Sequence, residues 1–91
     1  MSYFTGDNVP LKFTVTEGGV PVTPTVAKVT IVKPNFSMTA EVNATISSNV
    51  VSYVVPASVT TLQGYYEAYF VLTISGNERT HKMLFNVVVN P

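Results

Sequence analysis

The sequence predicts an all-β protein, folded as a two-layer antiparallel sandwich of about seven strands. Valine and threonine are its commonest residues, with 17 and 12 copies among 91, and ten aromatics accompany them; these residue types favour strands. Apolar residues recur at every second position, and no long window has the spacing of an amphipathic helix. Clusters of Gly, Asn, Ser and Pro separate the alternating segments, as turns do between strands. A chain of this length forms one domain, residues 1–91.

The first half of the chain is expected to supply three strands, at Ser2–Thr5, Val9–Glu17 and Val26–Lys33. Gly18-Gly19 marks a turn, and residues 20–24 (VPVTP) lack two amide donors, so they are expected to cross between the sheets in extended form. Alternation in the second and third strands directs six side chains inward: Val9, Leu11, Phe13, Val15, Val29 and Ile31.

The second half begins with the least regular stretch, Phe36–Ile46, which suits one long bent strand or two short ones. Further strands are expected at Val50–Val55, Gly64–Ile74 and Glu78–Val89, the last two joined by a tight hairpin at residues 75–77. No segment can supply a crossover helix, which argues against a parallel sheet. A closed six-stranded barrel is the structural alternative. Alternation directs Tyr66, Ala68, Phe70, Leu72 and Ile74 inward on one strand, and Met83, Phe85, Val87 and Val89 inward on the last. Val51, Tyr53 and Val55 share one face of their strand. Met38, Ala40, Val42, Ala44 and Ile46 also share one alternation.

Composition narrows the function classes. Five acidic residues balance five basic ones, and no basic cluster exists to follow a phosphate backbone, so nucleic acid is not an expected partner. The apolar runs are too short to span a membrane, no signal peptide precedes the first strand, and cysteine is absent. Only 11% of residues are charged, against about 25% in typical soluble domains. A weakly charged surface promotes association, which indicates either an assembly protein or a Thr-rich β-protein of ordinary kind.

Residues that carry catalysis are scarce. Asp7 is the only aspartate and His81 the only histidine, and no Gly-x-Ser-x-Gly motif presents a serine nucleophile. One histidine without cysteine cannot form a zinc site, and one carboxylate at Asp7 makes a poor calcium site. His81 shares its alternation with Met83 and Phe85, which predicts a partly buried or edge position. We therefore expect a protein that is not an enzyme, with no catalytic residue, cofactor or metal.

Two segments carry a resemblance to immunoglobulin-like domains. Residues 62–68 (LQGYYEA) resemble the Gly-x-Tyr-x-Cys corner of that family, with Ala68 at the cysteine position. Residues 6–16 (GDNVPLKFTVT), followed by a glycine turn and Pro21-Val22, resemble the second strand of bacterial and phage members. The resemblance implies an immunoglobulin-like sandwich in which Tyr66 bonds back to the preceding loop. The inter-sheet cysteines and the tryptophan of antibody domains are missing, which excludes an antibody-type domain.

The resemblance is strongest to small virion proteins of tailed bacteriophages, which are single immunoglobulin-like domains. It implies a complete stand-alone structural protein, made in the bacterial cytoplasm without a signal peptide and located in the virion. Its role would be capsid decoration, or an accessory role at the neck or tail. Its partners would be other virion subunits and copies of itself, with neither nucleic acid nor membrane. The alternative is an immunoglobulin-like adhesion or carbohydrate-binding module of a cell-surface or fibre protein.

Docking requires an exposed surface, and the sequence offers three candidate regions. The strand Gly64–Ile74 has an outward set that is unusually apolar for solvent, which Val32 and Val88 could extend. The second region is the turn after Pro34, and the third is the first strand, which either pairs within its own sheet or is donated to a neighbour. The candidate residues in these regions are Tyr3, Phe4, Phe36, Met38, Tyr65, Tyr69 and Val71.

Overall fold

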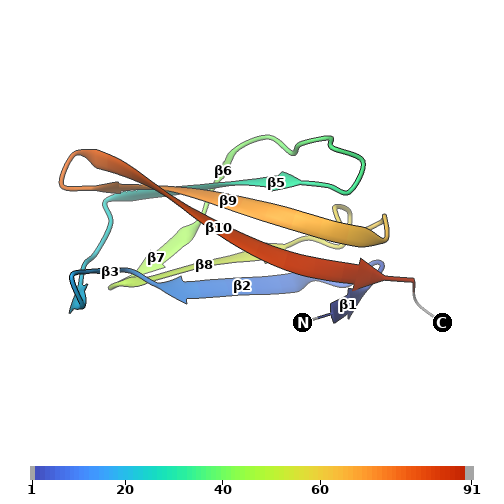
Figure 1. The fold of residues 1–91 in the computed structure, drawn as a ribbon, viewed down its shortest axis with the longest axis horizontal. Helices are drawn as coiled ribbons and strands as arrows, with labels where there is room; N and C mark the ends of the chain where they lie inside the picture. Colours follow the sequence, from blue (N-terminus) through green and yellow to red (C-terminus); the bar gives the residue numbers. More distant parts are fainter. Residues whose placement is uncertain (1, 90–91) are drawn as a thin grey trace.

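The computed structural model describes residues 2–89, and every regular element in that range is a β-strand. The molecule is elongated, 44 × 21 × 18 Å (Figure 1). The strands are β1 (Ser2–Phe4), β2 (Val9–Thr14), β3 (Thr16–Glu17), β4 (Val20–Pro21), β5 (Val26–Val32), β6 (Val42–Asn43), β7 (Thr45–Ser47), β8 (Val50–Val55), β9 (Gly64–Ile74) and β10 (Asn77–Val88). Residues 2–89 contain no helix that could cross a membrane.

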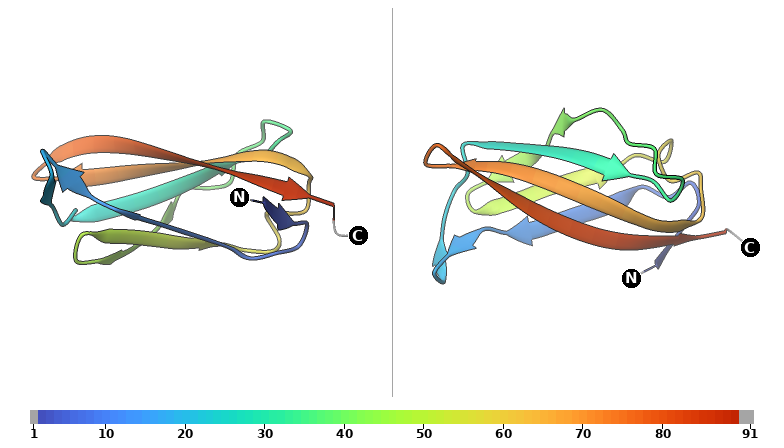
Figure 2. Two further views of the ribbon diagram at one scale, coloured as in Figure 1. Left: turned by 60° about the horizontal axis from the view of Figure 1, so that its bottom comes forward. Right: turned by 45° about the horizontal axis from the view of Figure 1, so that its top comes forward.

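Two sheets face each other across the core (Figures 1 and 2). The larger has the order β1-β10-β9-β5-β6 and the smaller the order β2-β8-β7. Neighbours run antiparallel except β1, which lies parallel to the end of β10. β5, β9 and β10 share the larger sheet, and β2 pairs with β8 in the smaller one, which is the immunoglobulin-like arrangement. The predicted sandwich is confirmed. The barrel alternative is wrong, because no strand pairing within residues 2–89 joins the two sheets.

The strand count differs from the predicted seven. The predicted strand Val9–Glu17 divides after Thr14, and its end pairs with Val20–Pro21 as the separate ribbon β3-β4. The segment 36–46 forms only a bridge between Met38 and Val32, then the short strands β6 and β7. Strand pairing with β5 is limited to Met38 at one end of the segment and to Val42 and Asn43 at the other, so residues 36–46 make no continuous ladder.

The core lies between the two sheets, and alternation predicted most of it. Phe70 packs edge-on against Phe13 with ring centroids 4.9 Å apart, and Tyr66 stacks on Phe85 at 5.0 Å. These contacts join β2 to β9 and β9 to β10. The fully or nearly fully buried apolar residues are Val9, Leu11, Val15, Ala27, Val29, Ile31, Val51, Val55, Tyr66, Ala68, Phe70, Leu72, Ile74, Phe85 and Val87.

The end of the last predicted strand is exposed, although alternation placed it inward. Val89 lies beyond the end of β10 at Val88 and is 59% exposed. Met38, Ala40 and Val42 are exposed as well, because their segment does not continue as a strand under the opposite sheet. The inward prediction for Val89 is wrong. Of the alternating set in residues 36–46, only Ala44 and Ile46 pack against the core.

Tyr66 fixes the entry to β9. Its hydroxyl donates to the carbonyl oxygen of Leu62 at 2.7 Å and, at the longer distance of 3.2 Å, to that of Val59. It also accepts a hydrogen bond from the Leu62 N–H at 3.2 Å. The bond back to the preceding loop that the resemblance implied is therefore present. Burial raises the pKa of the Tyr66 phenol, and the Leu62 hydrogen bond offsets part of that rise.

Candidate interaction surface

The outer face of the five-stranded sheet is built by alternation along β9. Ala68, Phe70 and Leu72 point inward and are buried, so the intervening residues point away from the core. Tyr65 is the most exposed of this outward set, at 73%. Glu67, Tyr69, Val71 and Thr73 are half-buried, because side chains of β5 and β10 flank them on both sides.

Tyr69 lies in a polar network in the middle of this face. Its hydroxyl donates to Oε2 of Glu67 at 2.7 Å, and Nζ of Lys82 lies 4.0 Å from the other Glu67 oxygen. The hydrogen bond to Glu67 raises the pKa of Tyr69, and desolvation and the Glu67 charge act in the same direction. Tyr69 and the half-buried Val71 are thus parts of the sheet surface rather than protruding anchors.

One end of the face is apolar and exposed. Strand register places Leu84, Glu67, Val32 and Met38 in one row across β10, β9, β5 and the segment after β5. Directly opposite residues share a face of the sheet, so this row lies on the outer side. Leu84 is 62% exposed and Met38 is 65% exposed. We call Val32, Phe36, Met38, Tyr65 and Leu84 the apolar end of the outer face.

Phe36 and Tyr65, 29 positions apart in the chain, line the same hollow. Its volume is about 290 Å³, and Val32, Pro34, Lys33 and Glu67 complete its lining. Two charges of opposite sign therefore border a hollow that is otherwise apolar and aromatic. The structure brings together four candidates from two predicted regions, Phe36, Met38, Tyr65 and Tyr69, on one face.

The turn that carries Phe36 holds this side chain away from the protein. The Phe36 N–H donates to the Lys33 carbonyl at 2.9 Å, and the Asn35 side chain accepts from the Ser37 N–H at 3.1 Å. These bonds set the Phe36 φ at 67°, a left-handed value that is rare for a bulky residue. The ring is 88% exposed. A strained backbone that exposes an aromatic ring is a feature typical of binding sites.

The two N-terminal candidates, Tyr3 and Phe4, lie in different environments. Tyr3 is half-buried opposite Val87, with its ring edge-on to Phe85 at a centroid distance of 6.2 Å, so it belongs to the core margin. Phe4 pairs with Val88 and is 43% exposed, so it lies at the β1 side of the outer face. In the structure β1 pairs with β10 of its own sheet. This is one of the two alternatives expected for the first strand, the other being donation to a neighbour.

Leu84 is the surface residue that sequence reasoning missed. It shares its alternation with Lys82 and Asn86, opposite to that of the buried Phe85. The alternation that predicts an outward Val88 on this strand indicates the same direction for Leu84.

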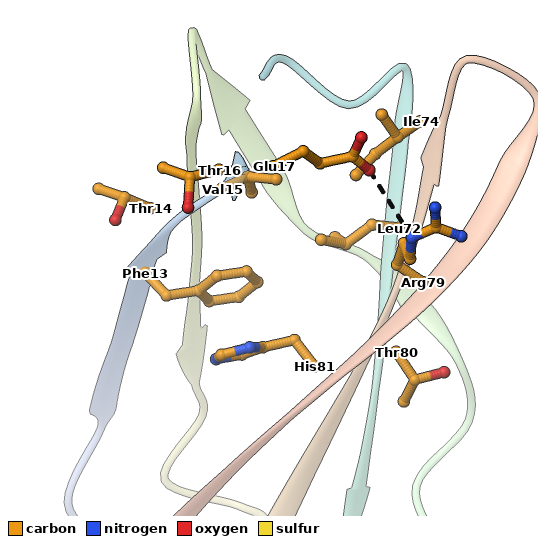
Figure 3. A pocket seen from close by; sticks show the side chains of 10 residues that line it. All are labelled: Phe13, Thr14, Val15, Thr16, Glu17, Leu72, Ile74, Arg79, Thr80 and His81. Carbon is orange, nitrogen blue, oxygen red and sulfur yellow. Dashed lines mark ion pairs between the residues drawn. The ribbon is translucent and has the colours of Figure 1, made fainter. Parts of the chain in front are cut away.

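A second hollow lies at the open side of the sandwich, between β2 and β10 (Figure 3). Its volume is about 340 Å³. The His81 ring stacks on Phe13 at a centroid distance of 4.0 Å, and Glu17 pairs with Arg79 at 3.6 Å across the opposite rim. His81 is exposed at the edge, so the edge alternative for this residue is the one observed. Within residues 2–89, no three His, Asp or Glu side chains group as metal ligands would.

Comparison with protein-family models finds no matching family, and comparison with curated proteins finds no matching relative.

Proposed function

We propose that this protein is a docking module that is not an enzyme, and that it binds other protein subunits through the apolar end of the outer face. The observation that carries the proposal is the exposure of Phe36, Met38, Tyr65 and Leu84 at 88%, 65%, 73% and 62% on one face. Isolated apolar side chains are ordinary on a protein surface, but a group of this kind marks an interaction site.

The composition of the surface favours a protein partner. Aromatic residues and methionine are enriched at the centres of protein interfaces, and charged residues are depleted there. The apolar end has this composition, and the charged residues Lys33 and Glu67 stand at its border. Two exposed rings around one hollow are suited to receive a large side chain of the partner.

The setting we propose is a bacteriophage virion, with the protein as a capsid decoration protein or a neck or tail accessory protein. The resemblance of residues 6–16 to the second strand of bacterial and phage immunoglobulin-like domains supports this setting. A chain with 11% charged residues and zero formal net charge is also suited to being covered in an assembly.

The test is cosedimentation of the purified protein with virus particles produced from the genome that encodes it, stripped of this protein. Wild-type protein is expected to move into the particle fraction. Tyr65→Glu and Leu84→Glu are expected to stay in the supernatant, because each places a carboxylate in a desolvated contact. Val54→Glu is the matched control, since Val54 is 56% exposed on β8 of the opposite sheet. Wild-type protein that stays in the supernatant with the particles present would overturn the virion setting.

A carbohydrate-binding module is the second candidate, favoured by the hollow between Phe36 and Tyr65. Exposed rings can stack on sugar faces, and the Glu67 carboxylate at the border can accept hydroxyl hydrogen bonds. Saturation-transfer NMR against a panel of oligosaccharides distinguishes this candidate. Signal transfer that disappears in Tyr65→Ala would support sugar binding in place of protein docking.

A further inference from the structure

β10 has a partner along its whole length on only one side. On that side β9 pairs with Asn77–Val87, whereas on the other side β1 pairs only with Asn86–Val88. No strand within residues 2–89 pairs with the second edge between Glu78 and Leu84, where the Glu78 carbonyl accepts only a long hydrogen bond, 3.4 Å, from the Arg79 side chain. The residues from Asn77 to Lys82 are all exposed, so this half of β10 is an open sheet edge. Such an edge is a template for pairing with another strand.

The hydrogen-bonding groups at this edge can be assigned. The Val88 carbonyl accepts from the Thr5 N–H at 2.9 Å, so the Val88 backbone groups point away from β9. In a strand, the N–H and C=O of alternate residues point to the same side. Glu78, Thr80 and Lys82 therefore present their backbone groups to the open edge, and their side chains lie on the outer face.

These three residues form a self-complementary set. In an antiparallel pair related by a two-fold axis at Thr80, Lys82 lies opposite Glu78 of the second copy. Symmetry places Glu78 opposite Lys82 of the second copy, so two ion pairs flank the axis. Opposite charges directly across an antiparallel pair are stabilising, and like charges are destabilising. A lysine alone on an edge discourages pairing, but the acidic residue four positions earlier makes this edge match itself.

The geometry points to a symmetric dimer, in which β10 pairs with β10 of a second copy about Thr80 and the two five-stranded sheets become one. This inference does not rest on the virion setting. In the dimer, the outer faces of both copies lie on the same side of one continuous sheet. A particle would then meet two apolar ends together, which strengthens weak binding through multivalency.

The other long open edge is less suited to this role. The Val15 N–H donates to the Asn49 carbonyl at 2.7 Å, so β2 turns the backbone of Pro10, Lys12 and Thr14 away from β8. Pro10 has no N–H to donate, and no acidic residue on β2 matches Lys12. Within residues 2–89, β10 is thus the long edge whose donors and charges both fit a copy of itself.

Lys82 is able to take part. Its ammonium lies at 4.0 Å from Glu67 and 6.0 Å from the Tyr69 ring centroid, and about half of its side chain is exposed. A surface pair of this length holds the lysine weakly. The side chain can therefore contact Glu78 of a second copy without breaking a buried interaction.

Sedimentation equilibrium of the isolated protein, up to millimolar concentration, tests the dimer. The interface is a short ladder, so weak association is expected, with the average mass rising from 9.9 kDa towards twice that value. Lys82→Glu and Glu78→Lys each put like charges opposite one another and should abolish the rise. The double variant Glu78→Lys/Lys82→Glu restores opposite charges and should restore the dimer.

Lys28→Glu is the matched control. Lys28 lies on β5 inside the sheet, is 48% exposed, and pairs with Glu41 at 3.9 Å, as Lys82 does with Glu67. The control should dimerise as the wild type does. Wild-type protein that stays monomeric at millimolar concentration, or a double variant that stays as dissociated as the single ones, would overturn the inference. Both outcomes concern the dimer alone, and whether the apolar end binds particles is tested separately by cosedimentation.

Discussion

The Tyr66 hydroxyl and the Leu62 backbone exchange two hydrogen bonds. The hydroxyl donates to the carbonyl oxygen at 2.7 Å and accepts from the N–H at 3.2 Å, across four positions of chain. Tyr66 itself is fully buried and stacks on Phe85. The loop before β9 is thereby attached to the core, and this loop leads into the strand that carries Tyr65.

Tyr66→Phe should lower the free energy of unfolding by about 1–3 kcal/mol, because it removes these bonds and leaves backbone groups of Leu62 without their partner. Urea denaturation monitored by circular dichroism measures the change. Tyr65→Phe is the control, since Tyr65 is 73% exposed, and should leave the free energy of unfolding unchanged. Equal losses in the two variants would contradict a specific role for the corner.

The same residue predicts a pH dependence. The pKa of Tyr66 is raised in the folded protein above its ordinary value of 10.0, so folding favours the neutral phenol. This contribution to stability is fully present below pH 10.0 and is lost as the pH rises through the higher folded pKa. Thermal unfolding should therefore show wild-type protein losing more stability above pH 10 than Tyr66→Phe loses. Parallel curves for the two proteins would show that another group is responsible.

Phe70→Ala tests the inward alternation of β9. Phe70 is fully buried, and its ring meets Phe13 at 4.9 Å across the two sheets. Truncation of such a side chain costs about 3–5 kcal/mol, a large share of the stability of a domain of this size. Chemical denaturation should show a correspondingly lower midpoint, or a protein unfolded without denaturant. Val71→Ala, from the outward set of the same strand, should cost far less.

Features that depend on neighbouring residues in the chain could be predicted from the sequence, whereas features that depend on distant segments could not. The bounds of β8 and β9 agree with the structure, because period-two alternation and flanking turns are local properties. Residues 36–46 contain two short strands, as one of the two alternatives predicted, but Met38 and Val42 are exposed because no sheet covers them. Alternation states which residues share a face, whereas burial depends on what packs against that face.

The candidate surface also combines features that the sequence predicts with features that depend on the fold. The outward set of β9 was predictable, but the hollow that joins Phe36 to Tyr65 depends on how the turn after β5 folds. Leu84 reaches the patch through the register of β10 on β9, which the sequence does not specify. The match between Glu78 and Lys82 also acquires meaning only once β10 is known to have an open edge.

The last prediction concerns the approach of Gly64 to Pro34, which places the turn after β5 beside the start of β9. Gly64 has a φ of 131°, and a Cβ added there would lie 2.8 Å from the Cβ of Pro34. Gly64→Ala should therefore lower the free energy of unfolding by about 2–4 kcal/mol, from backbone strain and the clash together. Gly76→Ala is the control for a positive φ without a clash, because Gly76 has a φ of 81° and no atom within 4 Å of the added Cβ.

Urea denaturation of both variants measures the difference, which reports the clash with Pro34 together with the greater backbone strain at Gly64. Gly64→Ala should also weaken particle binding at temperatures where it remains folded, since moving Pro34 alters the hollow lined by Phe36 and Tyr65. Gly76→Ala should bind as the wild type does, because the hairpin at Gly76 is remote in register from Tyr65 along β9. Equal stability of the two variants, together with unchanged binding, would show that the Pro34 turn moves without consequence for the surface.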